Sequence, residues 1–174
     1  MMLGKTLGNG YAITAVLGKY EIMKAAENTF ISSTFWTERI GPTAALKTLE
    51  VMERLKSWEK ISKIGLKISK RLANVARKYE IKLELSGLPA LISFSIKAND
   101  WSKYKTYITQ EMLKKGILSS NSIYSCTEHS EEIIEQYFYE LDNIFFNIAE
   151  CENGKDINDL LDGPVSHKGF QRLN

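Results

Sequence analysis

The chain has few of the residues that mark disulfide-bonded or metal-binding proteins. Its 174 residues include only two cysteines, Cys126 and Cys151, and two histidines. The cysteines lie far apart in sequence, so they form neither a zinc-site spacing nor a disulfide framework. Cys126 and His129 could form half of a metal site, but the sequence offers no second half. We therefore expect no metal, and we interpret the cysteines as free thiols of a cytoplasmic protein.

The sequence also lacks a long apolar run and a strong charge of either sign. No stretch approaches the roughly 18 apolar residues that a membrane span needs. The apolar residues 11–17 are interrupted by Thr14 and flanked by glycines, which is not typical of a signal-peptide core. The formal net charge is +2. We therefore expect neither membrane nor nucleic acid as a partner, and the basic residues between Lys56 and Lys78 are interpreted as a solvated helix face.

A lysine near the start of the chain lies in a glycine-rich turn. Residues 4–10 read Gly-Lys-Thr-Leu-Gly-Asn-Gly. Glycine allows positive φ and close approach of a ligand to the backbone. A lysine held in such a turn can be desolvated, which lowers its pKa and makes the amine a nucleophile. The stretch alone is compatible with an ordinary turn, with a phosphate-binding loop, or with a lysine that forms an imine.

The phosphate-binding loop is disfavoured by two features of the sequence. That motif requires a glycine five positions before Gly4, which the sequence does not include. It also requires a helix after Thr6, and the Gly-Asn-Gly that follows opposes one.

Four collinear segments carry a resemblance to a known family. They are residues 4–16, residues 31–38 with 42–49, residues 110–118, and residues 163–174. In this order they resemble the class-III pyridoxal-phosphate-dependent aminotransferases, most nearly the glutamate-1-semialdehyde aminomutases. The resemblance runs over nearly the whole chain. It implies amino-group transfer between a small-molecule donor and acceptor with pyridoxal 5'-phosphate, and it leaves transamination and intramolecular amino exchange open.

The resemblance implies roles for five residues. Lys5 is identified as the catalytic lysine that forms a Schiff base with the cofactor and moves a proton during the reaction. Gly8 and Gly10 are expected to shape the turn beside the cofactor. Ser33 and Thr34 are expected to bind the phosphate of the cofactor held by the neighbouring subunit, which implies a homodimer. The residues after Thr34 depart from the glycine-rich stretch of many family members, so the substrate stays open.

The periodicity of apolar residues predicts an α+β C-terminal domain, and the resemblance implies an α/β fold for the whole. In the first part we expect a buried strand at 11–17, a helix at 21–27 and, at 30–34, either a strand or a strand-like entry to a loop. Residues 42–78 predict two amphipathic helices, or one helix with a bend near Trp58. Strands at 81–85, 91–96 and 123–126, with helices at 103–115 and 128–150, predict about three antiparallel strands covered by helices on one face.

The resemblance also implies how the chain is divided and what it lacks. Residues 1–50 are expected to be the end of the large domain of a fold-type-I pyridoxal-phosphate enzyme, and residues 51–174 its small domain. Complete members are much longer, so the chain is expected to be a C-terminal fragment without the phosphate loop, the ring-stacking aromatic residue and the aspartate of the pyridine nitrogen. The alternative is a truncated, catalytically inactive product whose small domain serves only folding or contact with a partner.

Overall fold

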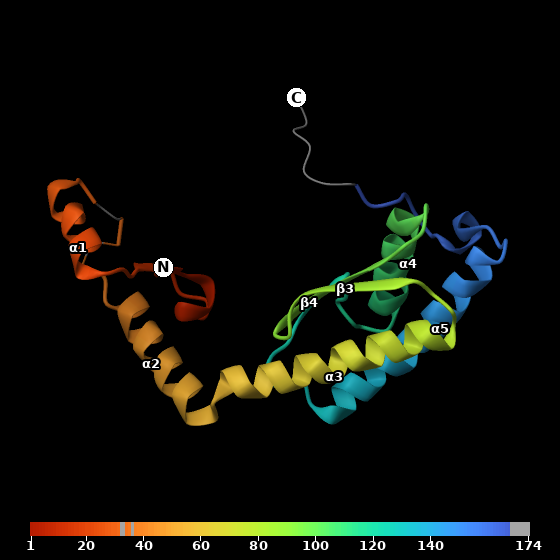
Figure 1. Cartoon of the computed structure of the whole chain (residues 1–174), viewed down its shortest axis with the longest axis horizontal. Helices are drawn as coiled ribbons and strands as arrows, with labels where there is room; N and C mark the ends of the chain where they lie inside the picture. Colours follow the sequence, from red (N-terminus) through yellow and green to blue (C-terminus); the bar gives the residue numbers. More distant parts are fainter. Residues whose placement is uncertain (32–33, 36, 168–174) are drawn as a thin grey trace. The chain divides into compact units, whose positions relative to one another are not determined.

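A computed structural model describes residues 1–31, 34–35 and 37–167. The chain divides into two compact units, Met1–Ser57 and Trp58–Asn174, which we call unit 1 and unit 2 (Figure 1). The expected boundary after residue 50 would have cut through helix α2 (Ile40–Leu55). The structure keeps this helix whole within unit 1.

Unit 1 is built from short elements that precede α2. Its elements in order are β1 (Met2–Leu3), the 3-10 turn η1 (Lys5–Leu7), β2 (Ala15–Val16), α1 (Tyr20–Met23), the 3-10 helix η2 (Lys24–Asn28) and α2. β1 and β2 pair antiparallel, with Met2 opposite Val16. The helix predicted at residues 21–27 is present as α1 and η2.

Two strand predictions in unit 1 were wrong. The strand expected at 11–17 is reduced to the two residues of β2, and it is not buried, since Val16 is 55% exposed. Of residues 30–34, the structure describes Phe30, Ile31 and Thr34, and none of these is in a strand. A strand needs a neighbour to pair its backbone groups. Among the described residues of unit 1, only β1 serves as such a neighbour.

Most large apolar side chains of unit 1 remain exposed. Of its described residues, only Gly8, Gly41 and Ala45 are buried. Phe30 is 95% exposed and Ile22 is 69% exposed, with more exposed apolar residues along α2. Amphipathic elements bury their apolar face only against a second layer. Unit 1 therefore has an uncovered apolar surface and little core of its own.

Unit 2 contains a three-stranded antiparallel sheet. Its strands are β3 (Leu83–Leu88), β4 (Leu91–Ile96) and β5 (Ser122–Tyr124), with β4 in the centre. Along β4, Ile92, Phe94 and Ile96 are buried on one face. On the other face, the Ser93 and Ser122 hydroxyls form a hydrogen bond of 2.9 Å. One apolar and one polar face is the arrangement predicted for a sheet covered by helices on one side.

Three helices cover the apolar face of this sheet. They are α3 (Ser57–Lys78), α4 (Trp101–Lys114) and α5 (Glu131–Glu152), and the 3-10 helix η3 (Ile157–Leu160) follows them. The core includes Leu72 from α3, Met112 from α4 and Phe145 from α5, all fully buried. Along α5, Ile134 lies in the core, whereas the neighbouring Ile133 is 50% exposed. One residue turns a helix by about 100°, so two adjacent isoleucines cannot both face the core.

A ladder of ion pairs joins α3 to α5. The pairs are Lys67–Glu131, Arg71–Glu135 and Lys78–Asp142. The partners are 64 residues apart in each pair, so the two helices run in the same direction. The basic face of α3 is thus not simply solvated, since part of it faces the acidic residues of α5. Water screens such surface pairs, so the ladder fixes the register of the two helices more than it stabilises them.

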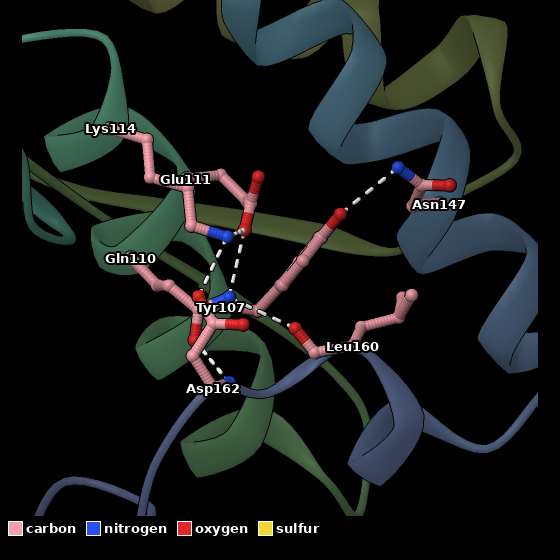
Figure 2. A network of polar contacts seen from close by, with 7 residues as sticks. All are labelled: Tyr107, Gln110, Glu111, Lys114, Asn147, Leu160 and Asp162. Atoms are coloured by element: carbon pink, nitrogen blue, oxygen red, sulfur yellow. Dashed lines mark hydrogen bonds and ion pairs between the residues drawn. The ribbon is translucent and has the colours of Figure 1, made fainter.

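The segment after η3 is tied to α4 by a polar network (Figure 2). The Gln110 side chain donates to the Leu160 carbonyl at 2.9 Å and accepts from the Asp162 N–H at 2.8 Å. Lys114 lies between two carboxylates, 2.6 Å from Glu111 and 2.7 Å from Asp162. These contacts hold the chain against α4 up to residue 162. Of the predicted tail segment at 163–174, residues 168–174 lie outside the described residues.

Helix α3 approaches the β3–β4 turn too closely for any side chain at Gly65. A Cβ at this position would lie 1.6 Å from the Pro89 carbonyl oxygen and 3.1 Å from the Ser125 hydroxyl. Gly65 is therefore a packing requirement of unit 2.

We expect Gly65→Ala to destabilise unit 2, against the usual effect of this substitution. Alanine in a helix interior is ordinarily favoured over glycine by about 1 kcal/mol, but the backbone clash with Pro89 should cost roughly 1–3 kcal/mol. Circular dichroism should show a melting temperature lowered by several degrees. Gly163→Ala is the matched control, because no atom lies within 4 Å of the added Cβ. A raised melting temperature for Gly65→Ala would show that α3 does not depend on this contact.

Candidate functional site

Lys5 lies in the loop of the small hairpin that β1 and β2 form. The strands place residues 4–14 in one connection, and η1 begins at Lys5. The Leu7 N–H donates to the Gly4 carbonyl at 3.0 Å, and the Gly8 N–H donates to the Lys5 carbonyl at 3.2 Å. Lys5 itself has a φ of +46°. For a residue with a Cβ, this left-handed backbone costs roughly 1–2 kcal/mol, so the surrounding turn holds the lysine in a strained position.

The two predicted glycines of the turn are required for different physical reasons. A Cβ at Gly8 would lie 2.1 Å from the Tyr11 carbonyl oxygen and 2.8 Å from the Ile13 side chain. Gly8 is buried, and the chain folds back over it. Gly10 has a φ of +107°, which side-chain-bearing residues rarely adopt, and open space where its Cβ would be. Gly8 thus allows the turn to fold onto the Tyr11 backbone, and the space beside the Cα of Gly10 is open.

The N-terminus of α2 packs against the same hairpin. A Cβ at Gly41 would lie 2.8 Å from the Ala12 carbonyl oxygen, so helix and loop are in close contact. The Glu38 carboxylate accepts hydrogen bonds from the Ile40 N–H and, at 3.2 Å, from the Gly41 N–H. A carboxylate at this end of a helix satisfies unpaired N–H groups and the positive end of the helix dipole. Glu38 therefore fixes the start of α2 beside the lysine loop.

The Lys5 amine is available for chemistry. The residue is exposed, and no hydrogen bond or ion pair engages its side chain among the described residues. An unpaired primary amine beside a loop that is open at Gly10 fits a cofactor that carries an aldehyde. Lys5 would hold such a group covalently.

The predicted phosphate-binding pair is only partly visible. Ser33 lies outside the described residues. Thr34 is exposed, just before the turn in which the Glu38 N–H donates to the Phe35 carbonyl at 3.0 Å. Its hydroxyl can therefore reach a ligand from outside this chain. No described hydrogen bond or ion pair joins Thr34 to Lys5.

Two other classes of site have no counterpart in the described residues. Within residues 1–31, 34–35 and 37–167, no group of three His, Cys, Asp or Glu side chains could hold a metal ion. None of the helices seen in that part of the chain is long and apolar enough to cross a membrane.

Sequence analysis did not identify the roles of Glu38 and Gly41. The Glu38 carboxylate accepts hydrogen bonds from the α2 backbone. The signal was present, since a Glu two positions before a helix that begins Ile-Gly-Pro can satisfy its first N–H groups. The close approach at Gly41 depends on the Ala12 backbone and has no local signature.

Comparison with known proteins places these residues in a family context. The family model of class-III aminotransferases matches residues 1–141, which include the lysine loop, all of unit 1 and the sheet of unit 2. The predicted tail segment at 163–174 lies beyond this match.

Individual relatives agree with the family match. The chain is 28% identical over 155 residues to the 3-aminobutyryl-CoA aminotransferase of Cloacimonas acidaminovorans, covering 86% of this chain and 37% of the relative. It is 28% identical over 149 residues to the glutamate-1-semialdehyde 2,1-aminomutase of Sulfurisphaera tokodaii, covering 76% of this chain and 36% of the relative.

A solved structure confirms the predicted fold class. The pyridoxal-phosphate internal aldimine form of the Sphingopyxis sp. MTA144 FumI protein matches with a TM-score of 0.78 at 20% identity. The match covers 92% of this chain and 39% of that one. The chain thus spans less than two-fifths of the length of these relatives.

We expect Gly8→Ala to open the lysine loop, because the new Cβ would collide with the Tyr11 backbone. A clash of this kind costs roughly 1–3 kcal/mol, so the amides of residues 7–11 should exchange with deuterium about tenfold faster or more. Hydrogen–deuterium exchange with mass spectrometry measures this directly. Gly4→Ala is the control, since its Cβ would make only an ordinary 3.4 Å contact with Thr14. Equal exchange in the two variants would contradict the role of Gly8.

Proposed function

The chain belongs to the class-III aminotransferase family, and we propose on this basis that it forms part of an enzyme that transfers amino groups with pyridoxal 5'-phosphate. Unit 1 would be the end of the large cofactor-binding domain, and unit 2 the small domain. The observation that carries the proposal is the free amine of Lys5 in a strained, glycine-closed loop inside the family match. Members of this family use pyridoxal phosphate, which confirms the predicted cofactor class.

Lys5 supplies the amine that the chemistry needs. When bound, pyridoxal phosphate acts as an electron sink for charge at the substrate α-carbon. Lys5 would hold the cofactor through its Nζ atom and, once released, carry a proton at the same atom. The loop would orient the amine, because Gly8 closes the turn behind it and Gly10 leaves the ligand side open.

Thr34 and Ser33 would hold the phosphate of a cofactor bound by a second copy of the protein. A hydroxyl is a good donor to an anionic oxygen. The exposed Thr34, with no described contact to Lys5, supports its use toward another subunit rather than toward its own lysine. We propose on this basis a homodimer in which each copy completes the other's site.

The uncovered apolar surface of unit 1 supports completion of the site by further polypeptide. Contiguous exposed apolar residues on a protein surface mark a place where another surface packs. In unit 1 they include Phe30 and Ile22, and they extend onto α2 at Leu46. Aligned relatives are more than twice as long as the aligned part, so the family contains the polypeptide that would cover this surface.

The substrates are proposed only as a class. The two curated relatives named above act, by their names, on an acyl-CoA β-amino compound and on an amino aldehyde. We propose a small-molecule amino donor and acceptor for this protein. Transamination and aminomutase chemistry both use the one lysine. The free thiols Cys126 and Cys151 support a cytoplasmic location.

A specific observation favours a second, non-catalytic candidate. Unit 2 has a continuous apolar core drawn from β4, α3, α4 and α5, whereas unit 1 does not. In this second proposal, the small domain folds and serves only assembly or contact with a partner. Catalysis requires Lys5, so the two proposals differ in what Lys5 does.

The test is selective labelling of Lys5. The full chain is incubated with pyridoxal phosphate, reduced with borohydride and digested, and each lysine is scored for the pyridoxyl group by mass spectrometry. We expect Lys5 to be labelled severalfold faster than Lys19 and Lys24, two exposed lysines of the same unit. We also expect weak overall binding, because the chain supplies only part of the pocket. Equal labelling of the three lysines would favour the non-catalytic proposal.

A variant pair separates covalent chemistry from charge. Lys5→Arg keeps a positive charge but cannot form an imine, so the label at this position should vanish. Lys24→Arg should leave the labelling of Lys5 unchanged. If the Lys5→Arg protein carried as much pyridoxyl label in total as the unsubstituted protein, the assignment of Lys5 as the catalytic lysine would be rejected.

A further inference from the structure

The first turn of α2 depends on one side chain, that of Glu38. The Thr43 N–H already donates to a backbone carbonyl at 3.0 Å, and Pro42 has no N–H. This leaves the N–H groups of Ile40 and Gly41, and the Glu38 carboxylate accepts a hydrogen bond from each. Glu38 therefore satisfies both N–H groups that the start of this helix would otherwise leave unpaired.

The same turn of α2 packs against the loop that contains Lys5. Helix α2 and the turn η1 are in contact. A Cβ at Gly41 would lie 2.8 Å from the Ala12 carbonyl oxygen and 3.2 Å from the Cβ of Ile13. The backbone of Gly41 thus lies directly against residues 12–13. Since Glu38 binds the Gly41 N–H, it fixes the part of the helix that makes this contact.

Ile13 extends the contact to the turn at Lys5. The Ile13 side chain is half-buried, and its Cγ2 would lie 2.8 Å from a Cβ at Gly8, so it packs directly on that glycine. The Gly8 N–H donates to the Lys5 carbonyl at 3.2 Å, and the Gly8 carbonyl accepts from the Tyr11 N–H at 3.1 Å. A β-branched side chain has few rotamers, so Ile13 moves with its backbone. A shift at Gly41 is therefore transmitted to Gly8.

We propose that Glu38 is a positioning residue for Lys5. Its carboxylate holds the first turn of α2 against Ile13, and Ile13 holds the Gly8 turn from which the amine projects. The inference rests on the proposed function, in which the Lys5 amine forms an imine with the cofactor aldehyde. The orientation of the amine decides how often it meets the aldehyde in a productive geometry. Glu38 acts through packing and needs no contact with the cofactor.

The test is a graded loss of selective labelling at Lys5 in the full chain, with the borohydride reduction described above. The imine forms between Nζ and the aldehyde carbon with loss of water, and borohydride supplies the hydride that reduces it. Glu38→Gln keeps one oxygen as an acceptor for two N–H groups, and Glu38→Ala keeps none. We expect the ratio of label at Lys5 to label at Lys24 to fall roughly twofold in Glu38→Gln and to roughly one in Glu38→Ala.

A matched control and hydrogen exchange separate positioning from helix capping alone. Glu53→Gln changes an exposed glutamate of the same helix that has no side-chain hydrogen bond or ion pair among the described residues, and it should leave the ratio unchanged. A residue that only caps α2 would, when replaced, speed exchange of the amides of residues 40–43. Under our proposal, the amides of residues 7–11 should also exchange about threefold faster or more in Glu38→Gln.

A double substitution tests whether the effect passes through Ile13. Ile13→Ala removes the side chain that packs on Gly8, so it should itself speed exchange at residues 7–11. Adding Glu38→Gln to Ile13→Ala should then speed exchange at residues 40–43 but give no further increase at residues 7–11. An equal further increase at residues 7–11 with and without Ile13 would overturn the proposal.

The labelling results distinguish this inference from the proposed function. If the unsubstituted chain is labelled selectively at Lys5 and Glu38→Ala is labelled just as selectively, the positioning role of Glu38 is overturned and the proposed function stands. If the unsubstituted chain shows equal labelling of Lys5, Lys19 and Lys24, the proposed function fails, and the positioning role fails with it.

Discussion

Close backbone contact where a Cβ cannot fit is the constraint on which both units depend. At Gly65, helix α3 meets the Pro89 carbonyl, and this contact sets how the helix lies over the β3–β4 turn. At Gly8, the lysine loop folds onto the Tyr11 carbonyl. In each case a single hydrogen in place of a methyl group lets two backbone segments approach to a distance that no other residue allows. The glycine positions therefore determine where the sheet receives its first helix and how the lysine is presented.

The two units differ in how far they satisfy their own apolar residues. In unit 2, the alternation along β4 directs Ile92, Phe94 and Ile96 into a core that three helices close. In unit 1, the loop and the short helices place polar and apolar groups side by side, and most of the apolar ones stay exposed. The proposed catalytic lysine is in the unit with the less complete core. This distribution indicates that unit 2 is the more stable unit, and it supports the proposal that other polypeptide completes the site in unit 1.

Much of unit 2 could be predicted from the sequence, and less of unit 1. The period-two pattern at 91–96 and the helical periods near Leu72 and Leu141 are strong local signals, and β4, α3 and α5 follow them. Residues 11–17 have the composition of a buried strand, yet only Ala15 and Val16 pair, because burial of a strand depends on neighbours that are distant in sequence. The family could be identified from the sequence, because Gly-Lys with its glycine turn and three further segments are local motifs in a collinear order, while the catalytic role of Lys5 stays a prediction. The pairing of α3 with α5 could not be predicted from the sequence, because its ion pairs join residues 64 positions apart.

The Glu38 carboxylate limits how this chain could bind a phosphate. The start of a helix is a natural anion site because its first N–H groups are unpaired. In α2, Glu38 already accepts from the Ile40 and Gly41 N–H groups, so an incoming phosphate would have to displace a negative side chain from them. A phosphate therefore gains more from the Thr34 hydroxyl, which is exposed, than from the α2 backbone.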